Sequence, residues 1–246
     1  MKTKTVFGAF LLILAGFANA QDIGQYEACI NGNGTLYTAG SPTLDGACED
    51  ATPVGDEAEA DDNIGANGLG SIIITLMNAG DYLISMFVDF EIDEAINTFF
   101  NEYGDSGGAL AAGQSWEIDE PGYLFGNIFD NFADSNETTG SLLDNSNGVP
   151  SGSDDDVSMA LGWDFTLEEG ETGVVSFFLD DEQPDSGFWL SHTDPWSEYT
   201  YYFSSTLEIR GDEEPPTDVP APGTLLLLGS GLLGMGLARR RRMRSQ

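Results

Sequence analysis

The chain has 246 residues and is strongly acidic, with 42 Asp and Glu against 8 Lys and Arg, a formal charge of −34. All the acidic side chains lie between Gln21 and Asp218, where Arg210 is the one Lys or Arg, so this region has a formal charge of −41. Such a charge repels nucleic acid and anionic membrane surfaces, which excludes both as partners of the region. Salt or bound cations must relieve the repulsion within it.

The first 20 residues have the three parts of a secretory signal. Lys2 and Lys4 give a positive start, Val6–Phe17 forms an apolar core, and Ala18-Asn19-Ala20 is a small-x-small cleavage site. The core is too short for a stable membrane helix, which needs about 20 residues. We therefore expect export through the Sec machinery and removal of residues 1–20 by signal peptidase. An uncleaved N-terminal anchor is the alternative.

Residues 21–70 are rich in Gly, Ala, Asp and Glu and poor in large apolar side chains. They contain both cysteines, Cys29 and Cys48, and an even cysteine count in an exported protein predicts a disulfide. Two cysteines and a single histidine exclude a structural zinc site. We expect a disulfide-pinned loop region or a short hairpin, followed by a solvated acidic loop over Gly55–Asn63.

Residues 71–212 are predicted to form an antiparallel β-sandwich body, so the fold class is mostly β. Strand-like runs occur at Ser71–Met77, Tyr82–Phe90, Val157–Leu167, Val174–Asp180 and Tyr199–Arg210. Several of them alternate apolar and polar side chains, as strands with one buried and one solvated face do. Short turn segments join the first run to the second and the third to the fourth, which predicts two β-hairpins.

Two stretches of the body follow helical spacing, which predicts one or two short helices. One covers Ile92–Tyr103, with Gly104 as its C-cap. The other covers Leu124–Phe132 and follows Pro121, a residue typical of helix starts. Irregular aromatic loops are the alternative for both. The Ser-, Asn-, Asp- and Gly-rich segment Ala133–Asp156 is expected to be a long connection at one end of the sandwich.

The C-terminal part consists of an acidic, Pro-containing stalk at residues 213–218 and a tail at residues 219–244. The tail contains an apolar segment at about 224–238, barely long enough to be a transmembrane helix. A basic block of Arg239, Arg240, Arg241 and Arg242 follows it. By the positive-inside rule this block stays in the cytoplasm, which places the acidic body on the other side of the membrane.

The tail resembles the sorting signal of PEP-CTERM proteins, which bacteria with an exosortase export and process at the envelope. That signal is usually Val-Pro-Glu-Pro, an apolar helix and an arginine cluster. The corresponding residues here are Val219, Pro220, Ala221 and Pro222. Ala221 replaces the usual glutamate, while the two prolines, the Leu/Gly segment and the arginine block match.

This resemblance implies export across the inner membrane of a Gram-negative bacterium and a transient anchor in that membrane. It also implies an exosortase-type membrane protease as partner, with release or attachment near Pro222 at the envelope, the cell surface or outside the cell. Family members are often linked to exopolysaccharide and the biofilm matrix, which makes exopolysaccharide a candidate partner. A plain type I membrane anchor is the alternative.

The sequence does not favour an enzyme. Its one histidine, His192, lies between Ser191 and Thr193 in what we expect to be a turn after a strand. Neighbours along a strand point to opposite faces, so Ser191, His192 and Asp194 cannot form a local catalytic triad. No Lys lies between residues 21 and 218, and no nucleotide-binding glycine motif or GxSxG elbow occurs. Abundant carboxylates leave a secreted glycoside hydrolase as the third alternative.

Calcium is the one cofactor that the sequence suggests, because it takes oxygen ligands from carboxylates and carbonyls. The candidate loops are Ser151–Asp156, Asp180–Gly187 and Asp61–Gly68, and the candidate ligands in the first two are Asp154, Asp155, Asp156, Asp180, Asp181 and Asp185. None of the loops has the spacing of an EF-hand. Solvated surface loops are the alternative interpretation.

Tryptophans could stack on sugar rings where they are exposed. Trp196 follows Pro195 in an expected turn and is the best candidate, whereas Trp163 lies on the core face of its strand.

From the signal peptide, the tail and the acidic composition together, we expect an exported envelope or matrix protein with a structural surface role. A calcium-dependent adhesin or glycan-binding module is the alternative.

Overall fold

The computed structural model describes residues 22–32, 35–39, 58–93, 98–122, 125–135 and 140–211. The predicted signal peptide, Cys48, the stalk and the sorting tail lie outside these residues. Within the described residues no helix has the length and apolar character needed to cross a membrane. The membrane helix predicted at about 224–238 is outside them and stays a prediction.

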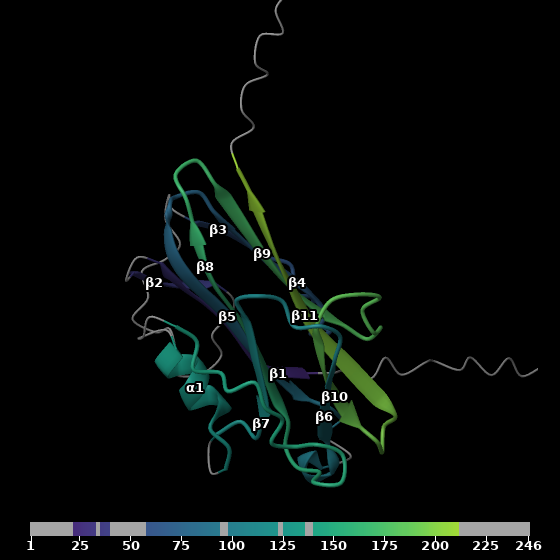
Figure 1. Cartoon of the computed structure of the whole chain (residues 1–246). Helices are drawn as coiled ribbons and strands as arrows, with labels where there is room; N and C mark the ends of the chain where they lie inside the picture. Colours follow the sequence, from purple (N-terminus) through teal and green to yellow (C-terminus); the bar gives the residue numbers. More distant parts are fainter. Residues whose placement is uncertain are drawn as a thin grey trace, which may run out of the picture. The chain divides into compact units, whose positions relative to one another are not determined.

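The described chain forms two antiparallel sheets (Figure 1). The order of the five-stranded sheet is β2 (Thr35–Ala39), β1 (Asp22–Gly32), β5 (Gly80–Glu91), β8 (Ser158–Leu167) and β7 (Gln114–Asp119). The order of the six-stranded sheet is β3 (Ala58–Asp62), β4 (Gly70–Leu76), β9 (Thr172–Asp180), β11 (Tyr199–Arg210), β10 (Trp189–Asp194) and β6 (Tyr103–Gly107). The prediction of a mostly β fold built from antiparallel sheets is confirmed.

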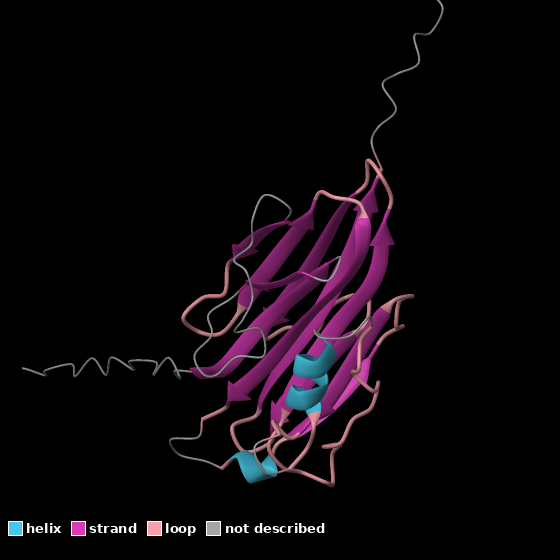
Figure 2. Cartoon of the chain, turned by 90° about the vertical axis from the view of Figure 1, so that its left-hand side faces the viewer, coloured by secondary structure: helices cyan, strands magenta, loops and turns pink. Residues whose placement is uncertain are grey.

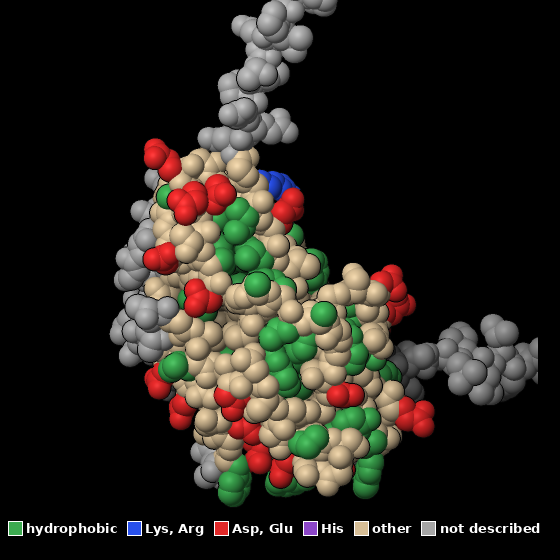
Figure 3. Space-filling model, viewed as in Figure 1, with side chains coloured by type: hydrophobic (Ala, Val, Ile, Leu, Met, Phe, Trp, Pro, Cys, Tyr) green, Lys and Arg blue, Asp and Glu red, His purple; other side chains and the backbone are tan. Residues whose placement is uncertain are grey.

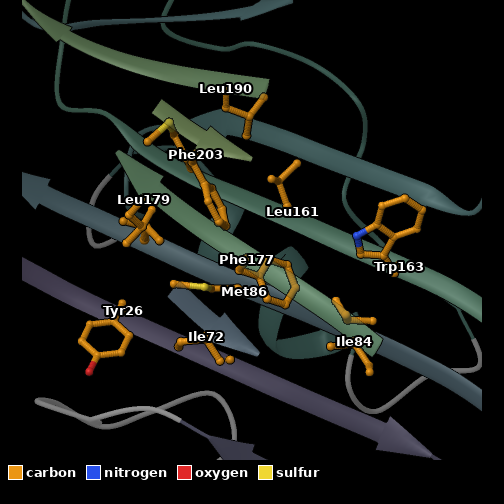
Figure 4. Close-up of a cluster of buried hydrophobic side chains, with 14 of the residues drawn as sticks. Tyr26, Ile72, Ile84, Met86, Leu161, Trp163, Phe177, Leu179, Leu190 and Phe203 are labelled. Atoms are coloured by element: carbon orange, nitrogen blue, oxygen red, sulfur yellow. The ribbon is translucent and has the colours of Figure 1, made fainter. Parts of the chain in front are cut away.

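A single apolar core lies between the facing sides of the two sheets (Figure 4). The five-stranded sheet contributes Ile84, Met86, Leu161 and Trp163, and the six-stranded sheet contributes Ile72, Phe177, Leu179 and Phe203. These side chains alternate along their strands because successive residues point to opposite faces. Polar contacts also cross the layer, since Trp163 Nε1 and Gln114 Nε2 donate to Ser205 Oγ at 2.9 and 3.1 Å.

The two predicted hairpins are wrong, although the strands themselves are present. β4 pairs with β9, and β5 pairs with β8, so each short connection crosses from one sheet to the other. The predicted strand at Val157–Leu167 therefore faces its successor across the core instead of lying beside it. Both arms carry an apolar face, and a crossing turn lets these faces bury each other. The alternation of side chains along the strands and the residues of the turn do not by themselves distinguish a connection that crosses between sheets from a hairpin.

The outer face of the five-stranded sheet is also covered, by the helix α1 (Ile128–Ser135) (Figure 2). Ile128 and Phe132 of α1 pack with Leu143 onto Phe87 and Ala160 of the sheet. The outer face of β5, with Leu83, Ser85, Phe87 and Asp89, is therefore buried too. An outer layer of this kind explains why this face carries the large apolar side chains of Leu83 and Phe87.

One of the two predicted helices exists. α1 overlaps Leu124–Phe132, although it begins later than the prediction at Pro121 implied. The helix predicted over Ile92–Tyr103 is wrong for the described part of that range. A single 3₁₀ turn, η1 (Phe99–Asn101), stands there, and Gly104 pairs with His192 inside a sheet instead of capping a helix.

The N-terminal region contributes strands to both sheets. β1 and β2 form a hairpin, as one of the two alternatives held, and β1 lies beside β5 along most of its length. The loop predicted over Gly55–Asn63 is wrong at residues 58–62, which form the edge strand β3. Tyr26 Oη donates to Asp62 Oδ2 at 2.8 Å and so links β1 to β3 across the two sheets. Cys29 is buried in β1, and its pairing with Cys48 stays a prediction.

The segment at residues 144–156, part of the predicted long connection, closes one open side between the sheets. It bonds the outer edge of β7 through Asn145 N to Trp116 O, Ile118 N to Ser146 O and Gly148 N to Ile118 O. It then bonds residues at the edge of β6 through Gly104 N to Val149 O and Asp155 N to Glu102 O. This strap satisfies backbone groups on edge strands that would otherwise be open to another chain.

Gly104 is predicted to be required where β6 approaches β7. A Cβ at this position would lie 2.4 Å from Cγ2 of the buried Ile118. The substitution Gly104→Ala should therefore reduce the free energy of unfolding by about 1–3 kcal/mol through overpacking. Urea unfolding followed by tryptophan fluorescence measures this change. Gly211→Ala is the control, because nothing lies within 4 Å of its added Cβ; equal effects of the two substitutions would contradict the prediction.

Candidate functional site

The predicted calcium ligands lie in two loops of the body. Asp154, Asp155 and Asp156 precede β8, whereas Asp180, Asp181 and Asp185 lie at the end of β9 and in the loop after it. Asp154 Oδ1 accepts from Gly152 N at 2.9 Å, and Asp180 Oδ1 accepts from Glu182 N at 3.1 Å. Within the described residues no three His, Cys, Asp or Glu side chains are grouped so that they could hold a metal ion. Calcium binding stays a prediction.

His192 does not lie in a turn, as the sequence suggested, but inside β10, where its side chain is fully buried. Its Nε2 is 2.6 Å from Oε2 of Glu102, which is 1% exposed. Glu102 directly precedes β6, so the contact joins the start of that strand to β10. Phe90 lies against this pair, with its ring centroid 6.3 Å from that of His192 and 5.1 Å from that of Tyr201.

Burial lowers the pKa of His192 to about 4, and the negative charges of Asp156 and Asp194 act more weakly in the opposite direction. The imidazole is therefore neutral at pH 7. With its proton on Nε2 and donated to the carboxylate, Nδ1 carries no hydrogen. Neither His192 nor Glu102 is accessible to solvent, so a dissolved substrate cannot contact either side chain in this structure.

Asp194 connects two surface segments near the His192–Glu102 pair. Its side chain is fully buried, and its Oδ1 accepts from Asn101 Nδ2 at 2.7 Å and from Trp196 N at 2.8 Å. One carboxylate oxygen thus ties η1 to the turn between β10 and β11. Next to these contacts Phe100 is 62% exposed and Trp196 is 74% exposed.

The predictions for two tryptophans are confirmed. Trp196 is the most exposed of the large apolar side chains in the described residues, and Trp163 is buried at 5% exposure. Trp116 is half-buried against Phe188, with ring centroids 5.5 Å apart. In the space-filling view, acidic and apolar side chains lie interspersed over the visible face (Figure 3).

Another buried carboxylate, Glu117 of β7, lies under α1. Both of its oxygens are 2.9 Å from Asn131 Nδ2, and Oε2 also accepts from Asp144 N at 3.2 Å. Burial raises the pKa of Glu117 to about 7, and these hydrogen bonds oppose the shift only in part. The sequence did not indicate this group, because an acidic residue on an outward strand face is expected to be solvated.

Comparison with known proteins gives one finding. The family model described as the PEP-CTERM protein-sorting motif matches residues 218–242. This range contains the predicted Val-Pro-Ala-Pro segment, the apolar segment and the arginine block. No curated protein sequence and no solved structure matches the chain.

Glu117 is predicted to make stability depend on pH. The pKa of Glu117 is about 7 in the folded protein and 4.5 in the unfolded chain, so the folded protein holds the proton more tightly. This difference stabilises the folded state fully below pH 4.5, and the stabilisation is lost as the pH rises to 7. The substitution Glu117→Gln should therefore match the native protein in thermal midpoint near pH 4.5 and exceed it at pH 8. Differential scanning calorimetry across this range measures the difference.

The exposed Glu59→Gln controls for removal of one negative charge. His192 has the opposite dependence, since its lowered pKa removes stability as the pH falls from 6.5 to 4. This contribution is common to both proteins and cancels in the comparison. A constant difference between Glu117→Gln and the native protein at all pH values would contradict a titration at this site.

Calcium is expected to raise the melting temperature above that in sodium chloride of equal ionic strength, because a ligand that binds only the folded state stabilises it. Replacement of Asp154, Asp155 and Asp156 by Asn should remove the calcium-specific part of the increase if the first acidic loop is the site. The same replacement of Asp180, Asp181 and Asp185 tests the second loop. An unchanged midpoint in calcium would refute the prediction.

Proposed function

We propose that this chain, which carries a PEP-CTERM protein-sorting motif at residues 218–242, is a structural protein of the bacterial cell surface or extracellular matrix. The motif supports export, transient anchoring in the membrane and processing by exosortase, a membrane protease. It is the observation on which the proposal rests. In this proposal the acidic β-sheet body is the part that acts outside the cell.

The distribution of charge supports this orientation. Arg239–Arg242 follow the apolar segment, whereas every Asp and Glu precedes it. The positive-inside rule keeps the arginines in the cytoplasm, and the acidic body is then the part that crosses. The 42 acidic side chains of the region from Gln21 to Asp218 attract counter-ions and water, and their charge keeps neighbouring copies apart. These properties suit a hydrated matrix, and we propose that the body works in association with exopolysaccharide.

The described side chains support a structural role over catalysis. His192 is fully buried and contacts Glu102, so it is not presented to a substrate. Ser191 is buried as well, at 4% exposure, and points to the opposite face of β10 from His192. Glu117 is hydrogen-bonded beneath α1. A hydrolase would instead need an acid and a base at an accessible surface.

Processing is predicted to depend on the prolines of the motif. The double substitution Pro220→Ala and Pro222→Ala should lead to accumulation of the unprocessed, larger form in the membrane fraction. Immunoblots of membrane, envelope and medium fractions measure this form. The double substitution Pro215→Ala and Pro216→Ala is the matched control, because these prolines precede the matched range. Unchanged processing of the first variant would contradict recognition of the motif.

The arginine block provides a second arm of the same experiment. Deletion of residues 239–244 should prevent normal processing, whereas replacement of Arg239–Arg242 by Lys preserves the charge that sets membrane orientation. Retained processing in the Lys variant assigns the block an electrostatic role, and lost processing assigns recognition to the guanidinium groups. A chain without residues 239–244 that is still processed normally would overturn the proposed sorting.

A further inference from the structure

Exposed aromatic side chains gather at one end of β10 and β11, on a surface that we call the aromatic tip. It consists of η1 (Phe99–Asn101) and the turn at residues 195–198. Phe100 and Trp196 are 62% and 74% exposed, and the rings of Phe99 and Phe100 lie 4.1 Å apart. Burial of one such side chain stabilises a protein by about 1.5–3 kcal/mol, so their exposure on a folded body has a considerable cost.

The aromatic tip is held rigidly from below. Asp194 Oδ1 bonds both Asn101 Nδ2 and Trp196 N, so the two halves of the tip share one buried acceptor. Glu198 closes the turn in the left-handed region at φ 60°, which is unfavourable for a side chain of this kind. Thr193 and Thr200 join their hydroxyls at 3.0 Å beneath it. A surface fixed in this way loses little conformational entropy when it binds a ligand.

Polar atoms at the aromatic tip are incompletely satisfied. Asn101 Oδ1 and Ser197 Oγ are buried and have no hydrogen-bond partner among the described residues. A buried polar group in this state costs about 1–3 kcal/mol, and native proteins contain few of them. Their concentration here places hydrogen-bonding capacity directly beside exposed aromatic rings. A ligand with apolar faces and many hydroxyl groups, directly or through bridging water, matches this combination.

The negative charge of the protein limits which polymers with many hydroxyl groups can bind at the tip. The one Lys or Arg of the described residues, Arg210, lies at the other end of β11 and is bound to Glu208 at 2.6 Å. An anionic polymer therefore finds no Lys or Arg at the tip, and it meets a chain whose residues 21–218 have a formal charge of −41. The two fully buried carboxylates beneath the tip, Glu102 and Asp194, are engaged inside the protein. These conditions favour an uncharged ligand.

We propose that the aromatic tip binds a neutral polysaccharide, with Trp196 and Phe100 stacking on sugar rings and the polar atoms beneath them bonding hydroxyl groups. The inference rests on the proposed function, which supplies a polysaccharide outside the cell. The position of the tip suits this role. The chain leaves the sheets after Arg210, at the end of β11 away from Trp196, so the tip lies at the far end of β11 from the residue that joins the body to the tail (Figure 1).

Affinity electrophoresis of the purified full chain in mild detergent tests the inference. Native gels containing hydroxyethylcellulose or dextran supply neutral polysaccharide, and gels containing alginate supply an anionic one. The native protein should be retarded in at least one neutral gel and not in alginate. Trp196→Ala and Phe100→Ala should each weaken the retardation about tenfold, equivalent to about 1.4 kcal/mol. Phe178→Ala, which removes an exposed aromatic side chain from β9, should leave it unchanged.

Other outcomes overturn the inference. Retardation in neither neutral gel, or equal retardation of the native protein and Trp196→Ala, removes the tip as a polysaccharide site. Retardation in alginate alone assigns an anionic ligand by another surface. Analytical ultracentrifugation completes the test, because a dimer that Trp196→Ala dissociates would assign the tip to a second copy of the chain. Normal processing of a protein that binds no neutral polysaccharide would remove this inference and leave the proposed sorting intact.

Discussion

The apolar layer between the two sheets is the interaction on which this structure depends. The region from Gln21 to Asp218 carries 42 acidic side chains and one basic one, Arg210, so electrostatic repulsion opposes its compaction at neutral pH. Side chains such as Met86, Leu161 and Phe177 from facing sheets provide the opposing force. The acidic and apolar side chains are separated by the period of two along each strand, because alternate residues point to the core and to the outside.

Three of the carboxylates that enter the interior have a specific polar environment. Glu102 contacts His192, Asp194 accepts two hydrogen bonds, and Glu117 lies beneath α1 with Asn131. Burial of a charged group is costly unless it is hydrogen-bonded or neutral. Three of these contacts connect elements that are distant in sequence: Glu102 with β10, Asp194 with η1, and Glu117 with α1.

The strap at residues 144–156 and the aromatic tip treat exposed groups of the sheets in different ways. The strap satisfies the edges of β7 and β6, which reduces the tendency of open strands to pair with other chains. The tip instead leaves Phe100 and Trp196 exposed on a framework fixed by Asp194. The strap thus protects one pair of sheet edges, whereas the tip keeps two aromatic rings exposed to solvent.

Several features could be read from local sequence because they depend on local chemistry. The sorting motif at residues 218–242, the strands at Tyr82–Phe90 and Tyr199–Arg210, the exposure of Trp196 and the burial of Trp163 belong to this group. Each follows from composition, charge order or an alternation of side chains over a few residues. These signals are complete within the segment that carries them.

Only the tertiary structure decided which strands pair, which outward faces are covered and which polar groups are buried. The two connections predicted as hairpins cross between sheets, because an apolar strand face can be buried across the core as well as beside a neighbour. Glu117 and Glu102 look like solvated acids in the sequence, and α1 and β10 bring Asn131 and His192 to them. Burial and pairing between distant segments depend on the whole packed body, whereas the period of a strand and the order of charges in the tail depend only on neighbouring residues.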